Sequence, residues 1–331
     1  MILSKDLLLK FLRAVLFGEK LDASDFAEAD WKSIFQLADE QTVSALLLDG
    51  MSQLPSECIA IPLGDKLKRI ATMQRIEQMN RLHRKVIVKI DQALKTEGIP
   101  VVFMKGQTTA LRYPNPLHRT PGDIDFVVNP KDFKKTMEVL EKIGKVDHDL
   151  VHEHHGMAWV DGVTVEPHYK VHNYQCPSTD YAMQEMFASV FPSELSSADM
   201  DGYAVPVFPP TFESVFLISH MVNHVYEEGL GLRQVIDYAM FLHHCADKID
   251  WLQHHEYLHQ MRMEKAWRIF TCICVDYLGM SLPSQVEAFS HQEKVWAAKM
   301  MTDIMRVGNF GRGEYVFHHR GFKDAFNNYC W

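Results

Sequence analysis

Cysteine is scarce in this sequence, and the cysteines present are not paired in any recognisable motif. None stands in a C-x-x-C pair of the kind that binds zinc or exchanges disulfides. We therefore expect buried or neutral thiols in a reducing compartment, and we interpret the protein as cytoplasmic. The cysteines among the 331 residues are Cys58, Cys176, Cys245, Cys272, Cys274 and Cys330.

Long apolar runs are missing as well. No stretch approaches the roughly 20 apolar residues that a helix needs to cross a bilayer. Lys5, Asp6, Lys10 and Arg13 interrupt the first apolar stretch, and no small-residue cleavage site follows it. We therefore expect no signal peptide, no membrane-spanning segment and no membrane partner.

An excess of positive charge is also absent. The chain has 34 Lys and Arg against 43 Asp and Glu, which gives a formal net charge of -9 at pH 7. This sign opposes bulk binding of nucleic acid, and the basic residues do not cluster with aromatics as in an RNA-recognition surface. The Walker-type loop and the nucleophile elbow are missing too. What remains is the composition of an ordinary folded protein, 47% hydrophobic and 23% charged.

Apolar residues recur at helical spacing at both ends of the chain, whereas the middle is rich in short β-like runs. These patterns predict an α+β fold, in which N- and C-terminal helical regions flank a small mixed sheet. One long helix is expected over 252–277. The predicted segments are a helical region over 1–95, an α/β core over 96–192, a connector over 193–210 and a helical domain over 211–331.

Two apolar strands are predicted within the core, over 99–104 and 123–128, and an amphipathic helix over 131–143 follows them. Asp161-Gly162 separates two further β-like runs. This dipeptide is typical of a two-residue hairpin turn. The core is therefore expected to hold a small sheet with helices packed on it.

Two aspartates alternate with apolar residues at the start of the second strand. Side chains at i and i+2 of a strand point to the same face, so Asp123 and Asp125 should lie side by side, opposite Ile124 and Phe126. Neighbouring carboxylates repel each other unless a cation or a shared proton offsets their charge. Glu166 lies in the predicted hairpin, which can pair beside this strand. Three carboxylates together form an oxygen-rich site that suits Mg²⁺ or Mn²⁺.

Lys105-Gly106 ends the first predicted strand and offers a phosphate contact. Glycine lets a backbone approach a phosphate closely, and the lysine supplies a cation to meet it. Arg119 is a second candidate for a phosphate contact. Glu166 can also accept the proton of an attacking hydroxyl.

The segment from 101 to 125 resembles a known family. It combines an apolar strand ending in Lys105-Gly106 with Tyr-Pro-Asn-Pro over 113–116, then Arg119 and Gly-Asp-Ile-Asp over 122–125. This pattern resembles the uncharacterised bacterial nucleotidyltransferases of the polymerase-β-like superfamily. The segment from Val165 to His168 resembles the family's later acid-x-His segment, and the regions 233–237 and 308–311 are also similar.

The resemblance implies a nucleotidyltransferase-like core that binds a nucleoside triphosphate, such as ATP, together with Mg²⁺ or Mn²⁺. A nucleoside monophosphate would pass to a hydroxyl of a small molecule or protein, with release of pyrophosphate. The residues implied as catalytic and metal-binding are Asp123, Asp125 and Glu166. Those implied as contacts of the nucleotide are Lys105, Gly106, Gln107, Arg119 and His168.

Two other functions stay open. Gly106-Gln107 stands where the superfamily usually has Gly-Gly or Gly-Ser. This difference motivates an alternative in which the same fold binds nucleotide, or another protein, without catalysing transfer. Transfer of a phosphoryl group is a further possibility at a site of metal and carboxylates. The sequence leaves the acceptor and the base preference open.

Histidines form two local groups to which we assign no metal. His152, His154 and His155 are expected in a loop before the hairpin. His220 and His224 have the i, i+4 spacing of a zinc-binding helix, but the intervening residues lack the acid of an HExxH motif.

Overall fold

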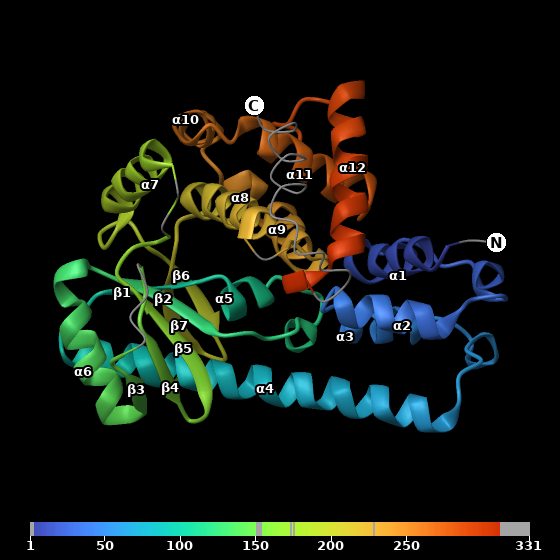
Figure 1. The fold of residues 1–331 in the computed structure, drawn as a ribbon, viewed down its shortest axis with the longest axis horizontal. Helices are drawn as coiled ribbons and strands as arrows, with labels where there is room; N and C mark the ends of the chain where they lie inside the picture. Colours follow the sequence, from blue (N-terminus) through green and yellow to red (C-terminus); the bar gives the residue numbers. More distant parts are fainter. Residues whose placement is uncertain (1–2, 150–153, 173, 175, 228, 312–331) are drawn as a thin grey trace.

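The computed structural model describes residues 3–149, 154–172, 174, 176–227 and 229–311. Figure 1 shows a sheet at one end of the molecule, helices gathered beside and above it, and the long helix α4 running beneath both. The longer α-helices are α1 (Ser4–Phe17), α2 (Trp31–Glu40), α3 (Ser44–Met51), α4 (Leu63–Thr96), α6 (Phe133–Ile143), α7 (Pro177–Val190), α8 (Pro210–Glu227), α9 (Leu232–Cys245), α10 (Trp251–Met261), α11 (Glu264–Asp276) and α12 (His291–Val307). A short helix, α5 (Gly106–Ala110), follows the first strand.

The described residues form a seven-stranded sheet in the order β3-β4-β5-β2-β1-β7-β6. At its centre, β2 pairs antiparallel with β1 and parallel with β5, and β1 pairs parallel with β7. The predicted mixed sheet and α+β class are therefore confirmed. The strands are β1 (Val101–Met104), β2 (Ile124–Val128), β3 (Lys145–Asp147), β4 (Met157–Val160), β5 (Val163–His168), β6 (Ser196–Met200) and β7 (Tyr203–Val207).

The predicted hairpin is confirmed at β4 and β5. Val160 pairs with Val163, and the turn between them consists of Asp161 and Gly162. Both turn residues have positive φ, 50° and 81°. Positive φ at both positions is what a two-residue hairpin turn of type I′ requires, and it explains the Asp-Gly dipeptide.

The segment 193–210, predicted as a connector from its composition, contains two further strands. It folds into β6 and β7, which extend the sheet beyond β1 around a turn at Asp201-Gly202. Val205 and Val207 alternate with more exposed residues and are buried. The serines and aspartates that suggested a linker lie on β6, at the edge of the sheet, where polar residues limit pairing with other chains.

Helices α4 and α6 cover one face of the sheet. Val86, Ile90 and Leu94 of α4 share a buried cluster with Phe103 of β1 and Phe126 of β2. The first half of α4 extends past the sheet, toward α2 and α3 (Figure 1). Leu63, Leu67 and Ile70, near the start of α4, are exposed, since the sheet does not cover them.

The opposite face of the sheet packs against a helical body, in which α1 to α3 and α8 to α12 share one core. Phe11 of α1, Val127 of β2 and Phe241 of α9 belong to the same buried cluster. The Gln41 side chain links the regions further: its amide nitrogen donates to the carbonyl of Ile304, and its oxygen accepts from the backbone N–H of Leu232, both at 2.8 Å. The helical regions at the two ends of the sequence thus form one layer.

The helix predicted over 252–277 is two helices. Arg262 adopts the left-handed conformation with φ 56°, and this conformation ends α10 before α11 begins. The apolar spacing continues on both sides of the break, which is why periodicity alone joined them. Within the described part of the chain, none of the helices combines the length and the apolar character that crossing a membrane requires.

Candidate active site

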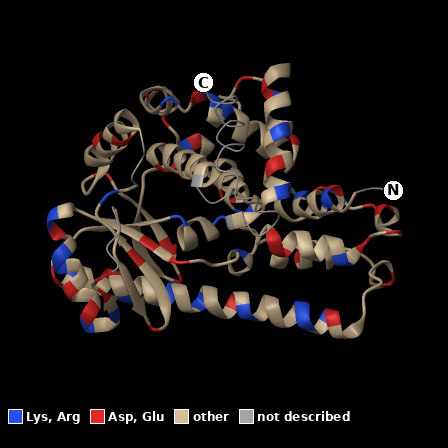
Figure 2. Ribbon diagram, viewed as in Figure 1, with Lys and Arg blue, Asp and Glu red and all other residues tan. Residues whose placement is uncertain are grey.

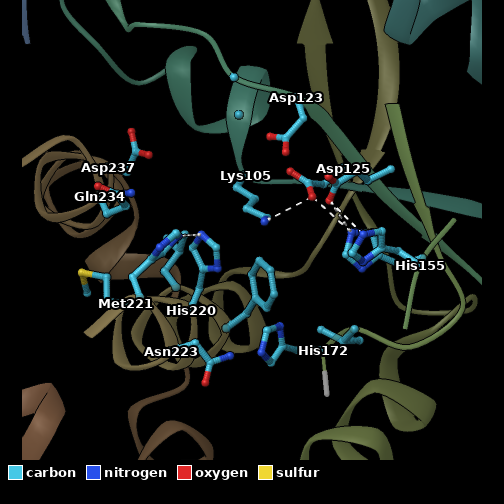
Figure 3. Close-up of a pocket in the computed structure, with 18 of the residues that line it drawn as sticks. Lys105, Asp123, Asp125, His155, His172, His220, Met221, Asn223, Gln234 and Asp237 are labelled. Carbon is cyan, nitrogen blue, oxygen red and sulfur yellow. Dashed lines mark hydrogen bonds and ion pairs between the residues drawn. The ribbon is translucent and has the colours of Figure 1, made fainter. Parts of the chain in front are cut away.

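The register of the sheet brings the predicted carboxylates together. β2 and β5 run parallel with Asp125 opposite Glu166. Ile124 and Phe126 point to the face covered by α4, as predicted, so Asp125 faces the helical body. Asp123 precedes the first residue of β2 and lies beside Asp125 in Figure 3.

A pocket of about 440 Å³ lies at this point, between the sheet and helices α8 and α9 (Figure 3). Side chains from β2 and β5 line one side, and His220, Met221 and Gln234 line the other. The predicted site residues that line the pocket are Lys105, Gly106, Arg119, Asp123, Asp125, Glu166 and His168.

Lys105 is held in a strained position beside the carboxylates. Its backbone has φ 44°, unusual for a residue with a side chain, and its Nζ lies 3.2 Å from Oδ1 of Asp125. Burial alone would lower the pKa of Lys105, but Asp125, Asp123 and Glu166 outweigh it and raise that pKa. The lysine is therefore charged at neutral pH.

The two aspartates respond oppositely to this environment. Burial acts to raise the pKa of Asp125, but Lys105 and a 3.1 Å hydrogen bond from Nε2 of His168 lower it below its ordinary value. Repulsion from Asp125, reinforced by burial, raises the pKa of Asp123. The repulsion between neighbouring carboxylates that the sequence predicts is thus present.

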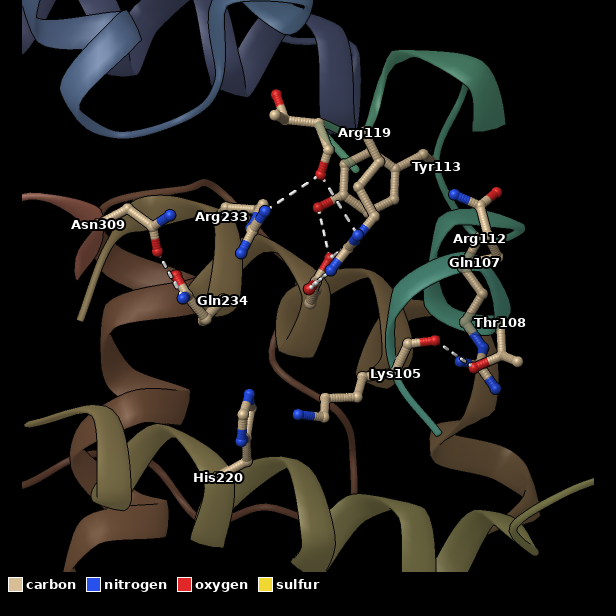
Figure 4. Close-up of polar contacts among 12 residues, drawn as sticks. Lys105, Gln107, Thr108, Arg112, Tyr113, Arg119, His220, Arg233, Gln234 and Asn309 are labelled. Atoms are coloured by element: carbon tan, nitrogen blue, oxygen red, sulfur yellow. Dashed lines mark hydrogen bonds and ion pairs between the residues drawn. The ribbon is translucent and has the colours of Figure 1, made fainter. Parts of the chain in front are cut away.

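Arg119 is buried and bound by another acid. Its Nε and Nη2 donate to the two carboxylate oxygens of Asp237 on α9, each at 2.8 Å, and Tyr113 donates to the same carboxylate at 2.6 Å (Figure 4). Both of these guanidinium nitrogens are therefore occupied. The sequence pattern did not indicate Asp237 as their partner.

Gln107 does not line the pocket. Its amide nitrogen donates to Oδ1 of Asn80 at 2.5 Å, on the α4 side of the β1–α5 turn. The Nδ2 of Asn80 in turn donates to the carbonyls of Leu117 and Arg119, at 2.7 and 2.9 Å. The side chain of Gln107 thus braces the loop that leads to Asp123. The predicted nucleotide contact from this residue would have to come from its backbone.

Six histidines line the pocket, five more than the sequence analysis selected. His154, His155 and His168 lie together, with His172 beside His154 at 5.1 Å between ring centroids, and His220 and His224 line the pocket from α8. Burial lowers the pKa of His172 to about 2 and that of His224 to about 3. Their clustering in the sequence was the available signal. His152, the remaining member of the first group, lies outside the described residues.

The donor set fits a divalent ion. Asp125, Glu166 and His168 each offer a ligand atom within 4.8 Å of the others. The two carboxylates are the oxygen ligands that Mg²⁺ and Mn²⁺ prefer. The raised pKa of Asp123 indicates unneutralised negative charge beside them, which an ion would offset.

The small mixed sheet thus presents Asp123 and Asp125 to the pocket, with a third acid, Glu166, on the parallel neighbour of β2. The sequence matches the family described as "Uncharacterised nucleotidyltransferase" over residues 27–279, more than half of the chain. The chain belongs to this family.

Two solved structures are similar in part. One is the solution structure of the antibiotic-resistance factor ANT(2'')-Ia, at 13% identity and TM-score 0.39, covering 55% of this chain and 95% of that one. The other is the crystal structure of an antigenic nucleotidyltransferase-like protein from Paracoccidioides brasiliensis, at 13% identity and TM-score 0.32, covering 56% and 91%. No curated protein matches the sequence.

Proposed function

We propose that this protein transfers a nucleoside monophosphate from a nucleoside triphosphate to a hydroxyl group, with Mg²⁺ or Mn²⁺ as its cofactor. The observation that carries the proposal is the convergence of Asp123, Asp125 and Glu166 with Lys105 in one pocket. Family membership supports nucleotidyl transfer in general. The metal, the nucleotide and the hydroxyl acceptor are our inferences.

Each of these residues has its own role in the proposed reaction. Asp123, Asp125 and Glu166 would hold the metal, which when bound neutralises phosphate charge. Lys105 is a buried cation that can meet the phosphates. Gly106 carries no Cβ, so its backbone can approach them.

The transfer step forms one bond and breaks one. The acceptor oxygen bonds to the α-phosphorus, and the bond from that phosphorus to the bridging oxygen breaks, so pyrophosphate leaves. The proton of the acceptor hydroxyl goes to a carboxylate oxygen of Glu166, which lies across from Asp125 in the sheet.

The acceptor would lie against α8 and α9. This side of the pocket offers apolar contacts from Phe216 and Met221, an amide from Asn223 and the buried His224. Burial keeps His224 neutral at physiological pH, so it can exchange hydrogen bonds with an uncharged hydroxyl compound. We therefore favour a small hydroxyl-bearing molecule, or an exposed hydroxyl of a protein, as the acceptor.

The test is Mg²⁺-dependent pyrophosphate release from each of the four nucleoside triphosphates, with pools of small hydroxyl compounds and proteins as acceptors. Asp125→Asn should reduce release by about 10²-fold or more, since it removes one charged group at the reacting phosphate. Asp161→Asn is the matched control. It makes the same change in an exposed turn carboxylate whose partner is Lys89.

Two other outcomes would decide against nucleotidyl transfer. Calorimetric binding of a nucleoside triphosphate that stays intact with every acceptor pool would favour the catalytically silent module. The replacement of Gly-Gly or Gly-Ser by Gly106-Gln107 motivates that reading. Release of a nucleoside diphosphate in place of pyrophosphate would indicate phosphoryl transfer.

A further inference from the structure

Three of the pocket histidines form a compact group of nitrogen donors. His154, His155 and His168 each offer a ligand atom, and these atoms lie within 4.8 Å of one another. The ring centroids of His154 and His155 are 4.5 Å apart, and those of His155 and His168 are 5.0 Å apart. The spacing suits ligands that surround a single ion.

The backbone holds this group together. His155 forms a β-bridge with His168, the last residue of β5, so the two residues lie opposite each other across a strand pair. The carbonyl of His154 accepts from the N–H of Tyr169 at 3.0 Å. Strand pairing, in place of a helical i, i+4 motif, therefore positions the histidines.

The chemistry of the group differs from that of the carboxylate site. Imidazole nitrogens favour Zn²⁺ and related transition-metal ions, whereas Mg²⁺ prefers oxygen. Nδ1 of His168 is buried and has no hydrogen-bond partner among the described residues, which is costly unless an ion or water contacts it. The carboxylate of Glu166 lies 3.7 Å from Nε2 of His155 and can supply negative charge to a bound ion.

We propose that His154, His155 and His168 form a second metal site that selects Zn²⁺-like ions over Mg²⁺. This proposal does not require transfer activity. The two sites share His168, which donates to Asp125 and lies 3.9 Å from Glu166. An ion held by the histidines is therefore coupled to the carboxylates, and its occupancy should alter Mg²⁺ affinity.

Co²⁺ is the probe, because nitrogen ligands in a four-coordinate site give it intense visible absorption. The full chain, without an affinity tag, is titrated with Co²⁺ and separately with Zn²⁺ in a calorimeter. We expect one ion per chain with a visible band, and an affinity at least about 10-fold lower in His154→Gln and in His155→Gln. Adding Mg²⁺ in large excess should not remove the band.

Two control variants test whether the ion binds at this histidine group. His259→Gln changes an exposed histidine on α10 and should leave the band and the affinity unchanged. His220→Gln, on the opposite wall, should do the same. Co²⁺ binding is measured without any transfer reaction. A protein that binds Co²⁺ at this group but catalyses no nucleotidyl transfer would therefore still support the second site.

Several results would overturn the proposal. One is wild-type protein that develops no visible band with Co²⁺, a result that needs no variant to fold. Another is a band that survives both His154→Gln and His155→Gln, or one that disappears in His220→Gln. Circular dichroism of each variant shows whether its loss of binding reflects unfolding, and the second ligand variant then decides.

Discussion

Asp237 holds Arg119 in place at the pocket. Its carboxylate accepts from Nε and Nη2 of Arg119 and from Tyr113, and both charged partners are almost fully buried. Removing one member of a buried pair leaves an uncompensated charge. We therefore expect Asp237→Asn to reduce the free energy of unfolding by about 3–5 kcal/mol.

Urea denaturation measures this loss, and an exposed ion pair provides the comparison. Asp161→Asn breaks the pair with Lys89, in which both side chains are well exposed, and should cost about 1 kcal/mol or less. Similar urea midpoints for the two variants would show that Asp237→Asn does not leave Arg119 as a costly uncompensated charge.

Distance along the chain decides which site residues could be predicted. Asp123 and Asp125 were predicted to share a face because the alternation of a strand is a local property. Asp237 is separated from Arg119 by 118 positions, and no local pattern links them. The proximity of His155 to His168 belongs to the same class, since it depends on the pairing of these two residues in the fold.

At the scale of elements, the N-terminus of α12 has a complete capping box. The Ser290 side chain accepts from the N–H of Glu293, and the carboxylate of Glu293 accepts from the N–H of Ser290. Arg268 of α11 donates to the same carboxylate. Its hydrogen bond is the main cause that lowers the pKa of Glu293 to about 2.

A lowered carboxyl pKa predicts a pH-dependent stability. Because Glu293 has a lower pKa folded than unfolded, its contribution is present above its ordinary pKa of 4.5 and is lost as pH falls toward 2. Wild type should therefore exceed Glu293→Gln in urea midpoint at pH 7, and the gap should shrink between pH 4.5 and 2.

The same urea series in Glu287→Gln, which removes an acid whose side chain takes no part in the capping box, is the control. A gap between wild type and Glu293→Gln that stays constant from pH 7 to pH 2 would contradict the prediction.

Elements with a regular spacing of apolar residues were predicted well. Elements in which polar residues and proline outnumber the buried apolar residues were not. α4, a helix of 34 residues, lies almost wholly within the helical region predicted over 1–95. β6 and β7 were interpreted as a connector because serine, aspartate and proline outnumber their few buried valines. The sheet order places them beside β1, a tertiary contact that composition does not encode.

Over the whole molecule, positive charge gathers on α4 but is matched within the chain. The helix has nine Lys and Arg against three Asp and Glu, and Figure 2 shows the basic residues spaced along it. Ion pairs with acids involve Lys68, Arg69, Arg81, Arg84, Lys89 and Lys95. This matching supports our expectation that the protein does not bind nucleic acid in bulk, which stays a prediction.

The shared core predicts that the chain unfolds as one unit. α1 and α2 pack into the cluster that contains α9 and the inner face of β2, and Gln41 bonds both Leu232 and Ile304. Deleting residues 1–61 exposes this surface and leaves two buried backbone groups without their partner, at a cost of about 1–3 kcal/mol each. The fragment 62–331 should therefore show no cooperative transition in a calorimeter.

A chain cleaved at a protease site inserted after the exposed Ala60 provides the control. Its two pieces stay packed through the shared core, so it should keep a single transition near that of the intact protein. If the fragment 62–331 alone melted cooperatively at the intact protein's temperature, the sheet and the C-terminal helices would form a core that does not need the first three helices.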